Sequence, residues 1–317
     1  MRLINYRPAI LDPNIYLANN DELLPYRLRP GYQGNYLGQE VKIDGEGNRV
    51  VVAAGTDGTL DATNERGGSP EKVVLLVGDS VVFGYGLRDE ETIASRLQGL
   101  LRAKGSSSEV QNIAAPGYSS WNEYAAIADY LKRHSATDLI IAYVPNDVTF
   151  ENDYFDIGKG KLAAFSDGWR QRLTHFLYSR VYTSFLISDT LKKLYHRFGG
   201  GAGQAAGGGM SEQESAAALD YSMQALSRVQ ALCRERGIRF AVGIYRDAVG
   251  FRGSPEKSLA YEETIRRSLE QRGIESFLIK AHAENLSDAD VRVFWNDPHP
   301  SARAVALMAG EVLKEIE

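Results

Sequence analysis

The stretch KVVLLVGDS, residues 72–80, places a serine directly after an apolar run. The run is short and rich in β-branched residues, which is typical of a strand buried on both faces of a sheet. In an open parallel sheet ligands bind beyond the carboxyl ends of the strands, so Ser80 is predicted to lie where a substrate would bind. A serine hydroxyl is a weak nucleophile and needs a base within hydrogen-bond reach.

His299 is the histidine best suited to be that base. The chain holds five histidines, and this one stands in FWNDPHPSARAV, between two prolines and two residues after Asp297. The prolines restrict the backbone of the predicted loop, and a carboxylate at that spacing can accept from the imidazole Nδ1–H and leave Nε2 to take the serine proton. The predicted catalytic set is therefore Ser80, His299 and Asp297. We expect Asp79 to be a hydrogen-bond partner at the turn and not a catalyst.

Two further positions follow the next two predicted strands. Gly117 lies in the turn after residues 109–114, and Asn146 follows residues 137–144. Acyl transfer generates an oxyanion that needs fixed donors, and the N–H groups of Ser80 and Gly117 and the Asn146 amide could supply three. Each residue alone has a simpler explanation, as a helix cap, a turn glycine or an Asx turn. The set favours catalysis, because one such residue ends each successive strand.

Strands and helices alternate from residue 72 onward. Strands are predicted at 72–77, 109–114, 137–144, 238–245 and 275–279, and helices at 91–105, 120–134, 213–236, 256–272 and 301–316. This alternation predicts an α/β domain over residues 71–317, with a mostly parallel sheet covered on both faces. Residues 1–70 are rich in Pro, Gly, Asn and Tyr, which indicates an extended arm with a small β element and no core of its own.

Residues 148–212 interrupt the alternation with an aromatic segment that we predict to be helical. It ends in a glycine-rich tract, typical of a flexible linker. Two interpretations stay open. The segment is either a surface insertion or a substrate wall beside the site. In the second case its aromatic residues would contact the ligand, namely Trp169, Phe176, Tyr178 and Tyr182.

These blocks resemble those of the SGNH hydrolases, also called GDSL-type esterases. That family carries Ser, Gly, Asn and His in this order, and here Ser80 in GDS, Gly117, Asn146 in the Asn-Asp pair and His299 match them. The match covers residues 72–147 and 290–316, and the arm LRPGYQGNYLGQEVKIDGEGNR is similar to the arm of many bacterial members. The resemblance implies a flavodoxin-like, three-layer α/β/α fold, with Ser80 as the nucleophile and His299 as the base.

The sequence departs from the family pattern at two places. The third block is usually Gly-x-Asn-Asp, whereas here Val144 stands in the place of the glycine. The last block is commonly Asp-x-x-His, whereas here Asn296 is three residues before His299 and the aspartate is Asp297. If the earlier position orients the histidine, the site would work as a dyad or through Asn296. Other members carry the Asp-x-His spacing, so we expect Asp297 to be the orienting residue.

The resemblance implies a serine esterase that hydrolyses small acyl esters, acetyl esters first, on small molecules or carbohydrates. A second hypothesis keeps the site and transfers the acetyl group to or from a bacterial polysaccharide. A third is a carbohydrate-binding protein with a decayed site, supported only by the departures at Val144 and Asn296.

Composition and motifs exclude several other classes. The net charge of −5 gives no general affinity for nucleic acid or acidic membranes. The first turn, GDSVVFGYG, lacks the Gly-x-Gly-x-x-Gly spacing of a nucleotide site, and no Cys/His cluster has metal-ligand spacing, so no cofactor and no metal are expected.

With one cysteine, Cys233, no internal disulfide forms. No signal peptide or membrane span is apparent, which predicts a cytoplasmic protein, or a periplasmic or secreted one if a leader was removed. The oligomeric state is not predicted.

Overall fold

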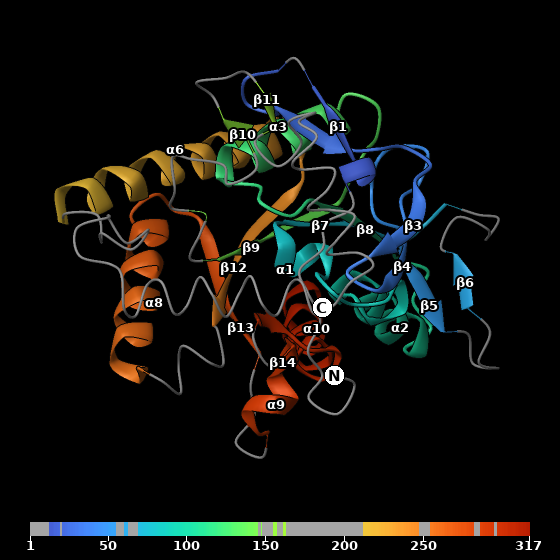
Figure 1. The fold of residues 1–317 in the computed structure, drawn as a ribbon. Helices are drawn as coiled ribbons and strands as arrows, with labels where there is room; N and C mark the ends of the chain where they lie inside the picture. The colour runs from blue at the N-terminus through green and yellow to red at the C-terminus, as the bar shows by residue number, and fades with distance from the viewer. Residues whose placement is uncertain are drawn as a thin grey trace.

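The computed structural model describes residues 13–19, 21–54, 60–62, 69–144, 147, 155–156, 161–162, 212–246, 254–281, 286–294 and 297–317. At its centre is a five-stranded sheet in which neighbouring strands are parallel (Figure 1). The strands are β7 (Val73–Gly78), β8 (Glu109–Ala114), β9 (Asp138–Tyr143), β12 (Arg239–Arg246) and β13 (Glu275–Lys280). Their order, β13-β12-β9-β7-β8, is the doubly wound order of flavodoxin-like folds, whose switch point lies between β7 and β9.

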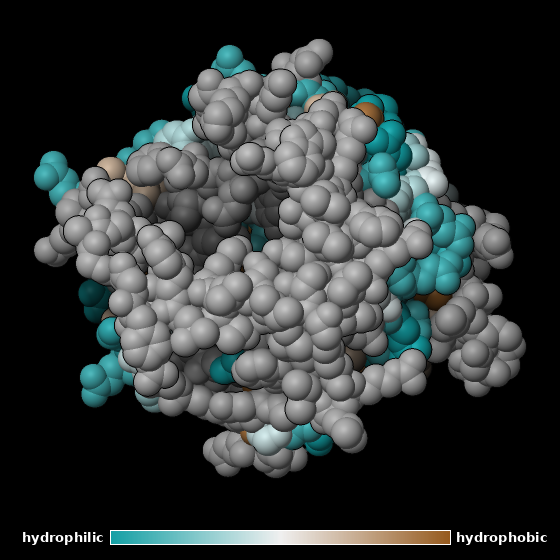
Figure 2. Space-filling view, viewed as in Figure 1, coloured by the Kyte–Doolittle hydropathy of each residue, from teal (hydrophilic) through white to brown (hydrophobic). Residues whose placement is uncertain are grey.

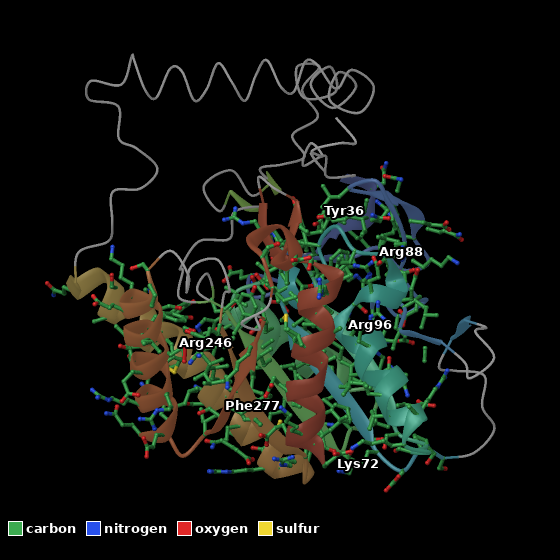
Figure 3. The ribbon with its side chains drawn as sticks, turned by 90° about the horizontal axis from the view of Figure 1, so that it is seen from below. Tyr36, Lys72, Arg88, Arg96, Arg246 and Phe277 are labelled. Atoms are coloured by element: carbon green, nitrogen blue, oxygen red, sulfur yellow. The ribbon has the colours of Figure 1, made fainter. Side chains whose placement is uncertain are left out.

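Helices cover both faces of this sheet, which confirms the predicted three-layer α/β/α fold. On one face α2 (Ile93–Ala103) and α10 (Ala302–Ile316) pack side by side (Figure 3). The other face is covered by α3 (Ser120–Tyr130), α6 (Glu212–Arg236) and α8 (Pro255–Glu270). The five strands and five helices predicted outside residues 148–212 are all present, except that α3 ends four residues before the predicted end at 134.

The core follows the two-residue alternation of the strands. In β7, Val74 and Leu76 pack with α2 and α10, whereas Leu75 and Val77 pack with α3, α6 and α8. All four side chains are fully buried, as expected for a strand covered on both faces. The carboxyl end of β7 is therefore held from both sides, and Ser80 follows it directly.

The N-terminal residues form three short antiparallel pairs. They are β1 (Tyr16–Ala18) with β2 (Tyr26–Leu28), β3 (Gln33–Tyr36) with β4 (Gln39–Lys42), and β5 (Val52–Ala54) with β6 (Leu60–Ala62). Buried side chains of this arm, such as Tyr26 and Tyr36, belong to the same cluster as α2 and α10. Arg49 forms an isolated bridge with Asn112 of β8, so the arm joins the open edge of the main sheet. The domain boundary at residue 70 stays a prediction.

Four of the short elements that were not predicted lie around Ser80 and His299. They are α1 (Ser80–Phe83), α9 (Asp288–Val291), β14 (Arg292–Phe294) and β15 (Asp297–Pro300). Elements of three or four residues are too short to show a hydrophobic period. His299 consequently lies in β15, paired with β14, and the predicted loop at this residue is wrong. Its flanking prolines are tolerated because a two-stranded ribbon leaves alternate backbone N–H groups unpaired.

Hydrophilic residues dominate the coloured rim of the face in Figure 2. Among the described residues, the exposed large hydrophobic side chains are Leu23, between β1 and β2, and Tyr221, Leu259 and Leu307, one on each of α6, α8 and α10. No helix in the described ranges is long and apolar enough to cross a membrane.

Candidate active site

Ser80 is presented by a tight turn between β7 and α1. Asp79 is the N-cap of α1, and its Oδ1 accepts from the Val81 N–H at 2.9 Å, as expected for a structural partner at the turn. A Cβ at Gly78 would lie 2.5 Å from Val82 Cγ2, so only glycine lets the chain turn this closely. The turn leaves the Ser80 side chain half-buried at the carboxyl edge of the sheet.

His299 meets Ser80 across 219 positions of sequence. Its Nε2 lies 2.8 Å from Ser80 Oγ. The serine hydroxyl also lies 3.1 Å from Asp79 Oδ2, and its single hydrogen can point to only one of these acceptors. A histidine that accepts this hydrogen at Nε2 must carry its own at Nδ1 when neutral. The structure thus brings together the two residues that sequence reasoning paired as nucleophile and base.

The turn that carries Gly117 is held by the arm. Gly117 has φ +83°, a left-handed conformation that favours glycine. On either side of it, the Tyr26 hydroxyl donates to Pro116 O at 2.8 Å and the Tyr118 hydroxyl donates to Tyr26 O at 3.2 Å. Among the described residues, neither the Ser80 nor the Gly117 backbone N–H donates to a backbone acceptor. Both remain able to donate to a ligand at the edge shared by β7 and β8.

The third strand ends in a closed turn. Asp147 Oδ2 accepts from the Val144 N–H at 2.7 Å, and the Asp147 N–H donates to Val144 O at 3.0 Å. Asn146 lies within this turn by sequence but outside the described residues. Its predicted role as an oxyanion donor stays a prediction.

Several other predicted residues lie beyond the described part. Asn296 is outside the described residues, and only the backbone of Asp297, in β15, is described, so neither orienting role is tested. Within the predicted insertion only β10 (Phe155–Asp156), β11 (Lys161–Leu162) and the start of α6 are described. The four aromatic residues of the predicted substrate wall are therefore outside the described residues, namely Trp169, Phe176, Tyr178 and Tyr182.

A buried acidic cluster lies beneath the site and was not predicted. Glu123 of α3 is fully buried, and among the described residues neither of its carboxyl oxygens has a hydrogen-bond partner. Burial and the nearby Asp79 raise the pKa of Glu123 well above its usual range. Burial, together with Glu123 and Asp79, likewise raises the pKa of Asp147. Because burial and the neighbouring carboxylates raise both pKa values, we infer that Glu123 and Asp147 hold at least one proton between them.

Two further residues near His299 were missed. The ring of Tyr85 stacks on the His299 imidazole, with centroids 4.2 Å apart. Arg49 is buried and binds the backbone just before and after Tyr85. Tyr85 lies within GDSVVFGYG, but no pattern marks it as a partner of His299. Arg49 stands alone beside the apolar run VVVAA, with nothing in the sequence to show what it binds.

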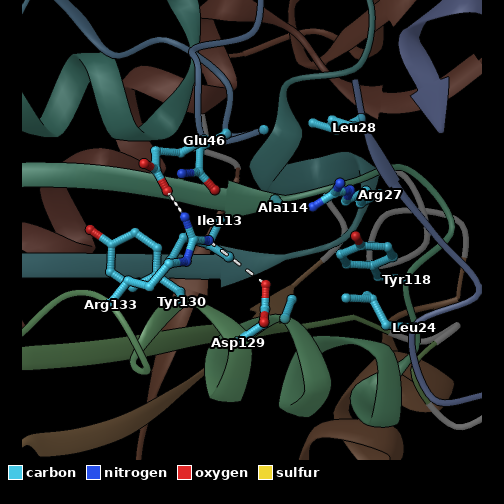
Figure 4. A pocket seen from close by; sticks show the side chains of 13 residues that line it. Leu24, Arg27, Leu28, Glu46, Ile113, Ala114, Tyr118, Asp129, Tyr130 and Arg133 are labelled. Carbon is cyan, nitrogen blue, oxygen red and sulfur yellow. Dashed lines mark hydrogen bonds and ion pairs between the residues drawn. The ribbon is translucent and has the colours of Figure 1, made fainter. Parts of the chain in front are cut away.

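A small cavity lies between the arm and α3 (Figure 4). Its volume is about 50 Å³, and its lining includes Tyr118, Tyr130 and Arg133. Arg133 already pairs with Glu46 and Asp129. The space suits a few water molecules and is too small for an ester substrate. In the described part of the chain, no group of His, Cys, Asp and Glu residues could hold a metal ion.

Comparison with known proteins gives structural likenesses only. No family model and no curated protein matches the sequence. The esterase EstA from Pseudoalteromonas sp. is 14% identical, with TM-score 0.43, over 78% of this chain and 97% of its own. Axe2, an acetylxylan esterase from Geobacillus stearothermophilus, is 13% identical, with TM-score 0.45, over 78% and 95%. A member of the lipolytic G-D-S-L family from Veillonella parvula is 12% identical, with TM-score 0.40, over 76% and 96%. The function proposed next rests on the geometry of the site.

Proposed function

We propose that this chain is a serine esterase of the SGNH type, with Ser80 as the nucleophile and His299 as the base. The observation that carries the proposal is the 2.8 Å contact between Ser80 Oγ and His299 Nε2. The contact lies at the carboxyl edge of a doubly wound sheet, where such folds bind their ligands. If Ser80 served only to cap a helix, its hydroxyl would not need to lie against the imidazole of His299.

In the proposed reaction Ser80 Oγ attacks the ester carbonyl carbon while His299 Nε2 takes the hydroxyl proton. The imidazolium then gives this proton to the leaving alcohol as the ester C–O bond breaks, and an acyl group remains on Ser80. Water attacks the acyl group with His299 again as base, which restores the serine. The N–H groups of Ser80 and Gly117 and the Asn146 amide are proposed to bind the oxyanion, and Asp297 to orient His299.

Two features of the turns support this assignment. The Gly117 turn is tied to the arm through Tyr26, and the turn after β9 is closed by Asp147. Donors that are fixed before the reaction stabilise a developing charge without reorganisation, as an oxyanion site requires. The intact Ser80–His299 contact also favours a working site over a decayed carbohydrate-binding one.

For the substrate we propose an ester with a small acyl group, acetyl first, on a small molecule or carbohydrate. The test is hydrolysis of p-nitrophenyl acetate, butyrate and octanoate by the wild type, Ser80→Ala and a control, Ser268→Ala. We expect Ser80→Ala to lower kcat by at least about 10³-fold, with Ser268→Ala unchanged and acetate the best substrate. Equal activity in Ser80→Ala and the wild type would overturn the proposal.

A further inference from the structure

A buried arginine of the arm holds the loop that follows α1. The Arg49 side chain is fully buried, and its guanidinium donates to Phe83 O at 2.5 Å, Gly84 O at 2.7 Å and Leu87 O at 2.6 Å. It also pairs with Asp89 at 3.1 Å. Only a planar guanidinium can donate in so many fixed directions at once. The backbone on both sides of Tyr85 is therefore fixed by one side chain.

Tyr85 uses this fixed position to support His299. Its ring lies nearly parallel to the imidazole, with centroids 4.2 Å apart and an interplanar angle of 22°. Tyr36 packs edge-on against the Tyr85 ring at 6.1 Å. In Figure 3, Tyr36 lies at the opposite end of the molecule from Lys72, which precedes β7, and hence on the side of the sheet's carboxyl edge. Tyr85 is thus a buried ring held between the arm and the imidazole.

The stacking has two consequences for a base. A ring flat against the imidazole limits its rotation, and rotation would break the 2.8 Å contact with Ser80. When the imidazole takes the serine proton it becomes a cation, and an aromatic face attracts a cation placed over it. The second effect acts at the transition state, where His299 carries charge, whereas the limit on rotation is already present in the resting protein.

We propose that Tyr85, anchored through Arg49, is a positioning residue for His299 that holds the imidazole against Ser80 and stabilises its charged form. The inference rests on the proposed function of the Ser80–His299 pair. It gives the N-terminal arm a direct part in arranging the site.

The chain offers a matched control. Tyr130 stacks on His134 with centroids 4.5 Å apart and an interplanar angle of 28°, and Tyr130 and Tyr85 are each 8% exposed. The Tyr130–His134 stack lies at the end of α3 that is remote from Gly117. Tyr130→Leu therefore removes a contact of the same kind without touching His299.

The experiment compares kcat and KM for p-nitrophenyl acetate in the wild type, Tyr85→Leu, Tyr85→Phe and Tyr130→Leu. We expect Tyr85→Leu to lower kcat about tenfold with KM changed by less than about twofold. Tyr85→Phe keeps the ring and should restore most of kcat, and Tyr130→Leu should match the wild type. Equal kcat values in Tyr85→Leu and Tyr130→Leu would overturn the inference while leaving the esterase proposal intact. A wild type without Ser80-dependent hydrolysis would overturn both.

Arg49→Lys tests the anchor. Lysine keeps a charge opposite Asp89 but cannot reach the three carbonyls, so kcat should fall in the same direction as in Tyr85→Leu. NMR gives a readout besides activity, because loss of the Tyr85 ring current should move the His299 ring-proton signals downfield in Tyr85→Leu. Unmoved signals in Tyr85→Leu would show that the stack does not form in solution and would overturn the inference. If Arg49→Lys does not fold, the Tyr85 variants decide whether the inference holds.

Discussion

At the scale of single residues, the carboxyl group of Glu123 predicts how stability depends on pH. In the unfolded chain it ionises near pH 4.5, whereas burial raises its pKa in the folded protein. Between these two pKa values the folded state holds a proton that the unfolded state has lost. The contribution of Glu123 is therefore fully present below pH 4.5 and is lost as the pH rises toward the folded pKa.

Glu123→Gln removes this titration and should gain stability relative to the wild type as the pH rises. We expect its free energy of unfolding, minus that of the wild type, to be at least about 1 kcal/mol higher at pH 8 than at pH 5. Urea unfolding at both values measures this difference. Glu270→Gln, at a side chain that is 71% exposed, is the control and should show no such trend. A difference that is independent of pH would contradict the buried, protonated state.

The residues predicted from sequence and those missed differ in what brings them to the site. Ser80 and Gly117 directly follow strands, so their place at the sheet edge could be predicted once the strands were recognised. Glu123 lies in the helical stretch SWNEYAAIADY, where a charged residue is expected on the exposed face. Only the packing of α3 shows that this side chain is buried. Tyr85 and Arg49 act through contacts between distant segments, which no local pattern encodes.

At the scale of elements, the turn that ends α1 depends on Gly84. Gly84 has φ +84°, and a Cβ there would lie 2.8 Å from Thr92 Cγ2 and 3.1 Å from Arg49 Nη1. We expect Gly84→Ala to lower the free energy of unfolding by about 2–4 kcal/mol, from both backbone strain and the clash, and to lower kcat as the Arg49 contacts shift.

Gly105→Ala separates these two causes. Gly105 has φ +79°, but a Cβ there would meet nothing within 4 Å. In Gly105→Ala the free energy of unfolding should fall by only about 1 kcal/mol, the cost of the backbone strain, and activity should be unchanged. Denaturant unfolding of both variants gives the comparison, and equal losses would show that the clash with Thr92 and Arg49 adds nothing to the backbone strain.

At the scale of the whole molecule, the arm and the sheet act as one unit through Tyr26. Its hydroxyl holds Pro116, next to Gly117. Tyr26→Phe should cost about 1–2 kcal/mol of stability, because it leaves a buried carbonyl without its donor. It should also lower kcat by about tenfold, because the Gly117 N–H, a proposed oxyanion donor, is then less well placed.

Tyr16→Phe is the matched control for this coupling. The Tyr16 hydroxyl bonds to the Tyr36 hydroxyl at 3.0 Å, a contact made within the arm. It should lose comparable stability with kcat within about twofold of the wild type. Comparable falls in kcat for both variants would show a general loosening of the arm and not a specific contact.

The most direct test of the central claim is the reaction of the protein with a p-nitrophenyl phosphonate, followed by intact-mass measurement and peptide mapping. We predict one adduct in the wild type, located on VVLLVGDSVVFGYGLR, residues 73–88, whose single serine is Ser80. Ser80→Ala should give no adduct, and His299→Ala should react far more slowly because Oγ lacks its base. An adduct that persists in Ser80→Ala, or a wild type that hydrolyses esters but is never labelled on this peptide, would contradict the assignment of Ser80 as the nucleophile.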